Sequence, residues 1–215
     1  MPRRWQTILV FTLIIAGCAE IPGFARSFDL NFPADVSMGE LWLMEDVNCF
    51  TCGNGSKNLG RATGRHRITL PAAHWYVRLR MPKNAAALMP RFSEPSLAQI
   101  GDLDLRGSDI SDDDLKHLAG VELRSIALSR TSITGAGLRH LKPHKKWIFV
   151  SLEDCERLDP AHLAHFRGWK RATIRVTSNR YNDPRHKVRM DALLNKAREI
   201  ICDNRPEESC GTQIR

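Results

Sequence analysis

A repeat of 23 or 24 residues in the second half of the chain constrains the fold more than any other feature of the sequence. Apolar pairs of the form Leu-x-Leu begin the units at Leu103–Leu105, Ile126–Leu128, Val150–Leu152 and Ile174–Val176. A second apolar group follows in the first three units at matching positions: Ile110, Leu115 and Leu118; Ile133, Leu138 and Leu141; Leu158, Leu163 and Phe166. Each unit therefore predicts a short strand, a polar turn and a short helix.

A unit of this size cannot bury its own apolar face, so neighbouring units must stack. The sequences of residues 103–120 and 126–143 resemble bacterial leucine-rich repeats, whose consensus is roughly L-x-L-x-x-T-x-I-T-x-x-G-L-x-x-L. The resemblance implies an α/β fold, a short leucine-rich-repeat solenoid with strands on its concave side and helices on its convex side. The third unit departs from the pattern by an insertion before Leu158, which affects the expected turn there. Cys155 occupies the position of Ser108 and Thr131, and we expect it to be a buried structural thiol.

Leucine-rich repeats usually bind their partners through the concave strand face, so the resemblance also implies where a partner would lie. The outward positions on the predicted strands are small or charged: Asp104, Arg106, Ala127, Ser129, Ser151, Glu153, Arg175 and Thr177. Among them Arg106 and Arg175 are the best candidates for contact. None of these residues is aromatic, so a tight and large interface through this face alone is not expected.

The regions that flank the units have different periodicities. Residues 27–82 alternate apolar and polar positions with period two, which predicts a small antiparallel all-β module, and residues 83–99 connect it to the repeats at 100–182. Residues 183–215 predict a capping helix that starts at Asp183–Pro184, followed by a short tail. The apolar face of that helix contains Met190, Leu193, Leu194, Ala197, Ile200 and Ile201. The alternative is an amphipathic membrane helix whose polar face carries Arg185, Lys187, Arg189, Lys196 and Arg198.

The first residues have the layout of an export signal. Arg3 and Arg4 precede a short apolar run, Ile8 to Ala16, and a small residue, Gly17, follows. The segment 15–18, Ile-Ala-Gly-Cys, resembles the lipobox of bacterial lipoproteins. That resemblance implies removal of residues 1–17, acylation of Cys18 and a tether over residues 18–26. Ala19 follows the cysteine in place of the Asp that retains such proteins at the inner membrane, so the resemblance favours the outer membrane.

The remaining cysteines would lie in an oxidising compartment, where closely spaced thiols tend to pair. Cys202 and Cys210 flank a short polar loop that a disulfide would close. Cys49 and Cys52 form a Cys-x-x-Cys motif, for which a structural disulfide is favoured. A redox-active pair and half of a metal site are the alternatives, but a turn-like sequence follows the motif and no second pair is nearby.

The sequence contains no recognisable catalytic motif, and we expect neither an enzyme nor a cofactor or metal site. His117, His140 and His165 occupy equivalent positions in three units, so the repeat explains them better than a metal cluster does. Asp112, Asp113 and Asp114 are expected to favour the start of a helix rather than to hold a cation.

Charge is distributed unevenly along the chain, which has a formal net charge of +8. Residues 94–114 contain seven acids and one base, whereas residues 139–198 contain 15 Lys plus Arg against six Asp plus Glu. The first functional hypothesis is a non-enzymatic, lipid-anchored envelope module that binds a protein or a glycan. The alternatives are a structural envelope component that contacts anionic lipid or lipopolysaccharide through the basic C-terminal half, and a periplasmic thiol redox protein. Nucleic acid is not expected as a partner.

Overall fold

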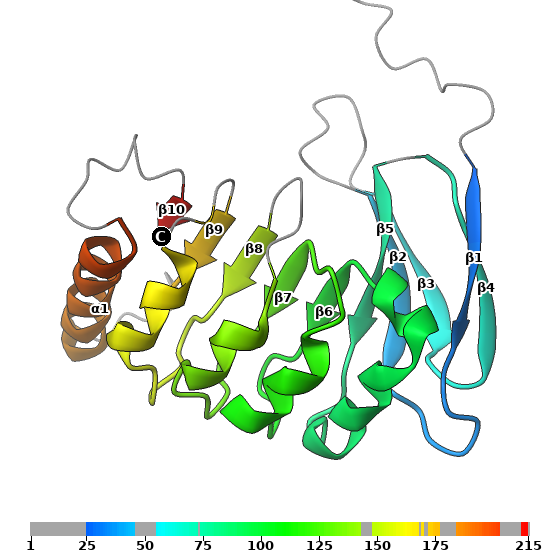
Figure 1. Cartoon of the computed structure of the whole chain (residues 1–215), viewed down its shortest axis with the longest axis horizontal. Coiled ribbons are helices and arrows are strands. Elements are labelled where there is room, and N and C mark those ends of the chain that lie inside the picture. The colour runs from blue at the N-terminus through cyan, green and yellow to red at the C-terminus, as the bar shows by residue number, and fades with distance from the viewer. Residues whose placement is uncertain are drawn as a thin grey trace, which may run out of the picture.

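The computed structural model has a mixed α/β fold, which confirms the predicted fold class at that level (Figure 1). It describes residues 25–45, 55–72, 74–142, 148–167, 169, 172–176, 184–202 and 212–214. An eight-stranded sheet has the strand order β10-β9-β8-β7-β6-β5-β2-β3, and β1 and β4 form a second, two-stranded sheet. The row of strands and the helices beside it form one layered body (Figure 1).

The strands are short, and most of the helices are 3₁₀ helices. The strands are β1 (Arg26–Asn31), β2 (Glu40–Glu45), β3 (Ser56–Arg61), β4 (Arg65–Leu70), β5 (Trp75–Arg80), β6 (Asp102–Asp104), β7 (Ser125–Ala127), β8 (Ile148–Ser151), β9 (Ala172–Arg175) and β10 (Thr212–Ile214). The 3₁₀ helices are η1 (Ala86–Ser93), η2 (Pro95–Gln99), η3 (Asp112–Leu118), η4 (Ala136–His140) and η5 (Pro160–Phe166). The one α-helix of the described residues is α1 (Pro184–Cys202).

The repeating units pair their strands in parallel and in register. Leu103, Ile126, Val150 and Ile174 lie opposite one another in β6 to β9, and each is fully or almost fully buried. Helices η3, η4 and η5 follow β6, β7 and β8 and cover the side of the sheet to which these residues point (Figure 1). The strands begin one or two residues before the Leu-x-Leu pairs, because the backbone pairing starts ahead of the apolar residues.

The turn after each strand is the same in three successive units. Gly107, Arg130 and Asp154 have positive φ angles of 67°, 60° and 60°. The next residue points inward: Ser108 donates to the carbonyl oxygen of Leu105 at 2.7 Å, and Thr131 donates to that of Leu128 at 2.7 Å. The left-handed turn thus places a small polar side chain where it satisfies a buried carbonyl group.

Cys155 occupies the same inward position in the third unit. It is a free, buried cysteine, and its thiol donates to the carbonyl oxygen of Leu128 at 3.2 Å. Burial raises the pKa of the Cys155 thiol. The prediction of a buried structural thiol is confirmed.

Asp112 connects the first unit to the second. Its carboxylate accepts hydrogen bonds from the backbone N–H groups of Thr134, Gly135 and Gly137 and from the Thr134 hydroxyl, at 2.8 to 3.0 Å. A Cβ atom on Gly137 would lie 2.2 Å from the Asp112 carbonyl oxygen, so the close approach requires glycine. Asp114, by contrast, accepts from the backbone N–H of Ser111 at the start of its own helix. The predicted role at a helix start therefore fits Asp114, whereas Asp112 serves the following unit.

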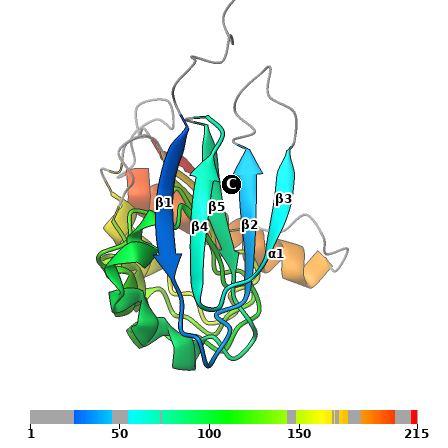
Figure 2. The ribbon, with the colours of Figure 1, turned by 90° about the vertical axis from the view of Figure 1, so that its right-hand side faces the viewer.

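The N-terminal strands continue the same sheet. Strand β2 pairs antiparallel with β3 and β5, as the period-two pattern predicts, and β5 pairs in parallel with β6. The β1–β4 pair packs over the core side of these strands through Leu30 and Ile68 (Figure 2). The segment 83–99 is not a bare connection, because it contains η1 and η2 with buried Leu88, Met89, Phe92 and Leu97. These apolar side chains join the core of the repeats to the core of the N-terminal strands.

Helix α1 covers the far end of the row of strands (Figure 1). Met190, Ala197 and Ile201 are buried, and Leu193 and Leu194 pack against the core, as the helical spacing predicts. Strand β10, which the sequence did not predict, extends the sheet beyond β9. None of the described helices is long and apolar enough to cross a membrane.

Candidate functional site

The candidate site is the side of the eight-stranded sheet that faces away from η1 to η5, called here the open strand face. Two rows of side chains cross it in register because successive residues of a strand point to opposite sides. The first row is Trp42, Arg78, Asp102, Ser125, Phe149 and Thr173. The second row is Glu40, Arg80, Asp104, Ala127, Ser151 and Arg175. Arg106, Ser129 and Glu153 extend the face from the turns that follow β6, β7 and β8.

Arg78 and Asp102 form the most deeply buried ion pair of this face. The guanidinium donates to one carboxylate oxygen at 2.6 and 2.8 Å, and the Asp102 side chain is only 2% exposed. Burial raises the pKa of Asp102, and the pairing with Arg78 offsets this effect only in part. The position of the Arg78 head group is thereby fixed on a face where one third of its side chain remains accessible.

Arg106 forms hydrogen bonds to the Asp104 carboxylate through two nitrogen atoms. Its Nε and Nη2 atoms lie 2.8 and 2.5 Å from the two carboxylate oxygens, in the bidentate geometry that arginine favours. Burial alone would raise the pKa of Asp104, but the hydrogen bonds from Arg106 outweigh it and lower the pKa. The Arg106 side chain is 44% exposed, so the pair places a fixed guanidinium group at the surface.

A chain of hydrogen bonds orders the centre of the face. The hydroxyl groups of Ser129 and Ser151 are 2.7 Å apart, and Ser151 donates to Glu153 at 3.0 Å. Glu153 also lies 4.0 Å from Arg175, at the limit of an ion pair. Both serines are 4% exposed, so they support Glu153 and Arg175 rather than reach a partner themselves.

Three aromatic side chains also belong to this region, and the sequence analysis missed them. Trp42 and Phe149 lie in the first row, and Tyr76 precedes Arg78 by two residues on the same face of β5; all three are half-buried. The Arg175 guanidinium lies 5.2 Å from the centre of the Phe149 ring, and that of Arg124 lies 5.1 Å from the centre of the Tyr76 ring. Both distances are within the range of cation–π contacts.

The alternation of side chains along a strand could have identified one of these aromatic residues from the sequence. Phe149 stands two residues before Ser151, which period two places on the same face. The Leu-x-Leu pattern marks outward positions only from the pair onward, so it does not identify the residue at the start of each strand. Trp42 and Tyr76 belong to the predicted all-β module, and only the pairing of β5 with β6 brings them to this face.

The predicted site residues have different outcomes. The structure brings together Asp104, Arg106, Ala127, Ser129, Ser151, Glu153 and Arg175 on the open strand face. Thr177, Cys18, Cys49, Cys52 and Cys210 lie outside the described residues. Cys202, at the end of α1, is buried and disulfide-bonded.

Two histidines of the third unit, His162 and His165, contact the backbone of the preceding unit. His162 Nδ1 lies 3.1 Å from the Thr134 carbonyl oxygen, and His165 Nε2 lies 3.4 Å from that of Leu141. His165 also packs edge-on against Trp169. Within the part of the chain that the structure describes, no group of three or more His, Cys, Asp or Glu side chains is placed to hold a metal ion.

Comparison of the chain with protein-family models, with curated proteins and with solved structures found no match.

Proposed function

We propose that the protein is a lipid-anchored, leucine-rich-repeat protein of the bacterial envelope that binds a protein partner through its open strand face. The proposed activity is binding rather than catalysis. Cys18 is the proposed lipid attachment site, and the outer membrane is the proposed location.

The repeat assignment is supported by agreement between sequence spacing and strand pairing. The units of 23 or 24 residues each contribute one strand to a parallel ladder, and the inward turn position holds Ser108, Thr131 or Cys155. The Asp112 carboxylate, which holds the start of η4 from the preceding unit, supports stacking of one unit on the next.

One observation carries the proposal of a binding face. Half-buried aromatic rings lie among arginines whose head groups are held by acidic side chains on the same face. Tryptophan, tyrosine and arginine are the residues that most often dominate the energy of protein interfaces. Because close ion pairs already fix Arg78 and Arg106, these two side chains lose less freedom on binding.

The charge of the face indicates the kind of partner. Arg78, Arg80, Arg106 and Arg175 are matched by Asp102, Glu40, Asp104 and Glu153, so the two rows and their extensions carry no net charge. A strongly anionic partner would have to compete with these internal carboxylates. A protein surface with mixed charge and an exposed apolar anchor for the ring of Phe149 fits better.

The test compares two substitutions of half-buried alanines. Ala127 lies in the second row of the open strand face, whereas Ala119 lies at the end of η3 on the helical side. The full chain with Ala127→Arg or Ala119→Arg would be crosslinked in solubilised envelopes, and captured proteins would be identified by mass spectrometry. We expect a discrete protein that the natural chain and Ala119→Arg capture and Ala127→Arg does not.

Two results would count against this proposal. Capture that Ala127→Arg leaves unchanged would place the interface elsewhere, and capture of glycan alone would replace the protein partner by a carbohydrate. Anchoring is tested separately with Cys18→Ala, which should remove the acyl chains that mass spectrometry detects on the natural chain. An unchanged acyl content would overturn the proposed attachment site.

A further inference from the structure

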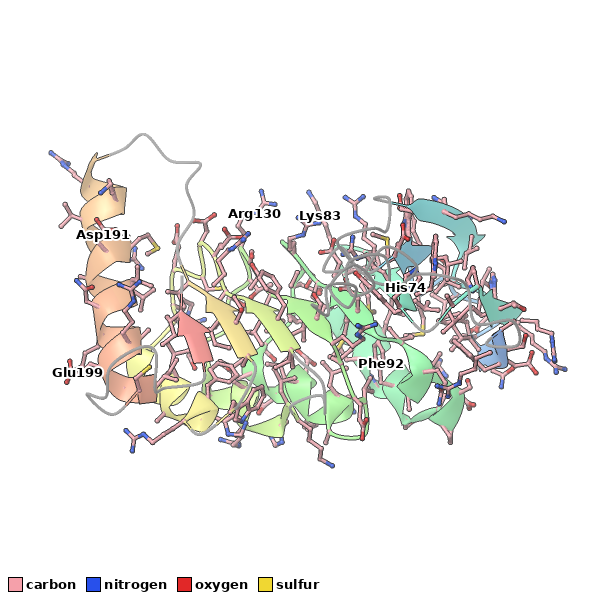
Figure 3. The ribbon with its side chains drawn as sticks, turned by 90° about the horizontal axis from the view of Figure 1, so that it is seen from above. His74, Lys83, Phe92, Arg130, Asp191 and Glu199 are labelled. Carbon is pink, nitrogen blue, oxygen red and sulfur yellow. The ribbon has the colours of Figure 1, made fainter. Side chains whose placement is uncertain are left out.

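The edge of the sheet at which the parallel strands begin, called here the entry edge, carries an excess of positive charge. Because β5 to β9 are parallel and in register, the residues that lead into them meet at this one edge. The exposed or half-exposed bases described in the segments that lead to this edge are Arg26, Arg124, Lys142 after η4, and Arg167 after η5, whose guanidinium donates to the Ile200 carbonyl oxygen at 3.0 and 3.1 Å. Figure 3 looks down onto it, with His74 near its centre.

Few acids oppose these bases. Among the described residues near the entry edge, Glu122 is exposed, and Glu45 is buried and lies 3.3 Å from the ring of His74. Glu199, next to the Ile200 carbonyl group that accepts from Arg167, is exposed and pairs with Lys196 at 2.8 Å. The entry edge therefore favours an anionic surface.

The start of the described chain lies at the same edge. Arg26 is the first residue of β1, and its guanidinium donates to Gln99 at 2.6 Å, at the end of η2 just before β6. Cys18 precedes Arg26 by eight residues, which span at most about 30 Å when fully extended. A lipid on Cys18 would thus hold the entry edge close to the membrane to which it is attached.

We infer that the entry edge lies against the anionic phospholipid headgroups of the bilayer that holds Cys18. This inference rests on the proposed lipid anchor. Tethering supplies the proximity, and Arg26, Arg124, Lys142 and Arg167 supply the attraction, which for each base near a bilayer surface changes binding by about fivefold. The strands then stand away from the membrane, and the open strand face is directed sideways.

Two lysines provide an internal control for this orientation. Lys142 is exposed at the entry edge, whereas Lys83 is exposed beyond the end of β5, where its carbonyl oxygen accepts from the backbone N–H of Asp109. Figure 3 labels Lys83 and Arg130; Lys83 follows the end of β5, and Arg130 follows the end of β7. The two lysines therefore report on opposite edges of one sheet.

The experiment uses the full lipidated chain reconstituted into vesicles. Vesicles of phosphatidylcholine alone are compared with vesicles that also contain phosphatidylglycerol, and amine acylation at Lys142 and Lys83 is followed by mass spectrometry. We expect acylation of Lys142 to slow by about fivefold or more on the anionic vesicles. Acylation of Lys83 should be the same on both.

Other outcomes overturn the inference. An equal change in the two acylation rates between the two kinds of vesicle would show that the entry edge is not the side applied to the bilayer. Slowing of Lys142 by inorganic phosphate without vesicles, at matched ionic strength, would indicate a free-phosphate site instead. Failure of the chain to float with either kind of vesicle would contradict the lipid anchor itself, and so separates the two proposals.

Two charge-reversing substitutions compare the same two edges through the affinity of the chain for vesicles. Lys142→Glu and Lys83→Glu change the net charge equally, and both are measured in the Cys18→Ala background without residues 1–17, so that headgroup attraction acts alone. Lys142→Glu should weaken sedimentation with the anionic vesicles by about 25-fold, because two units of charge are altered at the bilayer surface. Equal weakening by Lys83→Glu would mean that overall charge, not the entry edge, controls binding.

Discussion

On the core side of β6 to β9, the four residues in register are Leu103, Ile126, Val150 and Ile174; on the open side, the neighbouring row is Asp102, Ser125, Phe149 and Thr173. The core-side residues are all apolar, branched and buried. The open-side residues are an acid, two residues with hydroxyl groups and an aromatic residue. Stacking requires an apolar side chain at the same core-side position of every unit. On the open side it requires only that neighbouring side chains on adjacent strands are compatible. What differs from unit to unit is therefore the place to look for a binding site.

The largest expected effect follows from the core row. Ile126→Ala removes a fully buried side chain from the middle of the ladder and should lower the free energy of unfolding by about 4 kcal/mol. Ala127→Ser, at the next residue on the open side, should change it by less than about 0.5 kcal/mol. Urea unfolding followed by circular dichroism would measure both. Similar losses for the two variants would contradict the division between the faces.

Substitution of Arg78 tests whether its ion pair with Asp102, on the open side, also stabilises the fold. Arg78→Gln leaves the Asp102 carboxylate buried without its cation and should cost about 2 kcal/mol, less than a fully buried pair because Arg78 is partly exposed. Arg106→Gln, on the more exposed Asp104, should cost about 1 kcal/mol or less. Chemical unfolding at neutral pH would rank the two.

The loss of stability in Arg78→Gln should depend on pH in one direction. The pKa of Asp102 is already raised in the folded protein, and removal of Arg78 would raise it further. A raised carboxyl pKa favours folding at low pH and opposes it as the pH rises past the folded value. The defect of Arg78→Gln should therefore diminish as the pH falls, and Asp102→Asn in the same chain should relieve it at neutral pH. A defect that grows in acid would show that the pair is not its source.

The sequence predicted the core side well, for a physical reason. Leu115, Leu138 and Leu163 must fill equivalent spaces, so periodicity alone identifies them, and the helical spacing of Met190, Ala197 and Ile201 likewise identifies the buried side of α1. The open strand face was predicted only in part, because no repeated requirement marks Phe149. The parallel pairing of β5 with β6, which adds Trp42 and Tyr76 to this face, depends on a contact between segments of different periodicity.

Loss of the Asp112 contact between the first and second units should have a smaller effect on the free energy of unfolding. Asp112→Ala removes an acceptor that serves four donors of the next unit, and should cost about 1–2 kcal/mol given that the side chain is partly exposed. Asp113→Ala is the matched control, because Asp113 is the exposed neighbour in the same helix. Thermal unfolding would show the difference, and equal shifts in the two variants would contradict the bridging role of Asp112.

Acid should remove this contribution of Asp112. Partial burial alone would raise its pKa, but the hydrogen bonds from Gly137, Thr134 and Gly135 outweigh that effect and lower the pKa. A lowered carboxyl pKa contributes stability above the ordinary value, and the contribution is lost as the pH falls through the folded value. The stability of the natural chain and that of Asp112→Ala should therefore converge as the medium becomes acidic.

The smallest effect concerns the turn between the two faces, where every unit must reverse from the open side to the core side. Arg130 is exposed and has a φ of 60°, and the equivalent position in the preceding unit is Gly107 with a φ of 67°. A non-glycine residue in this region costs about 1–2 kcal/mol, and part of the gain from glycine is offset by its greater freedom in the unfolded chain. Arg130→Gly should therefore raise the free energy of unfolding by about 0.5 kcal/mol, measured by urea unfolding, while Lys83→Gly on the same edge should not raise it. Destabilisation by Arg130→Gly would mean that the arginine side chain stabilises the turn more than its backbone strain costs, and the turn would then differ from unit to unit as the open strand face does.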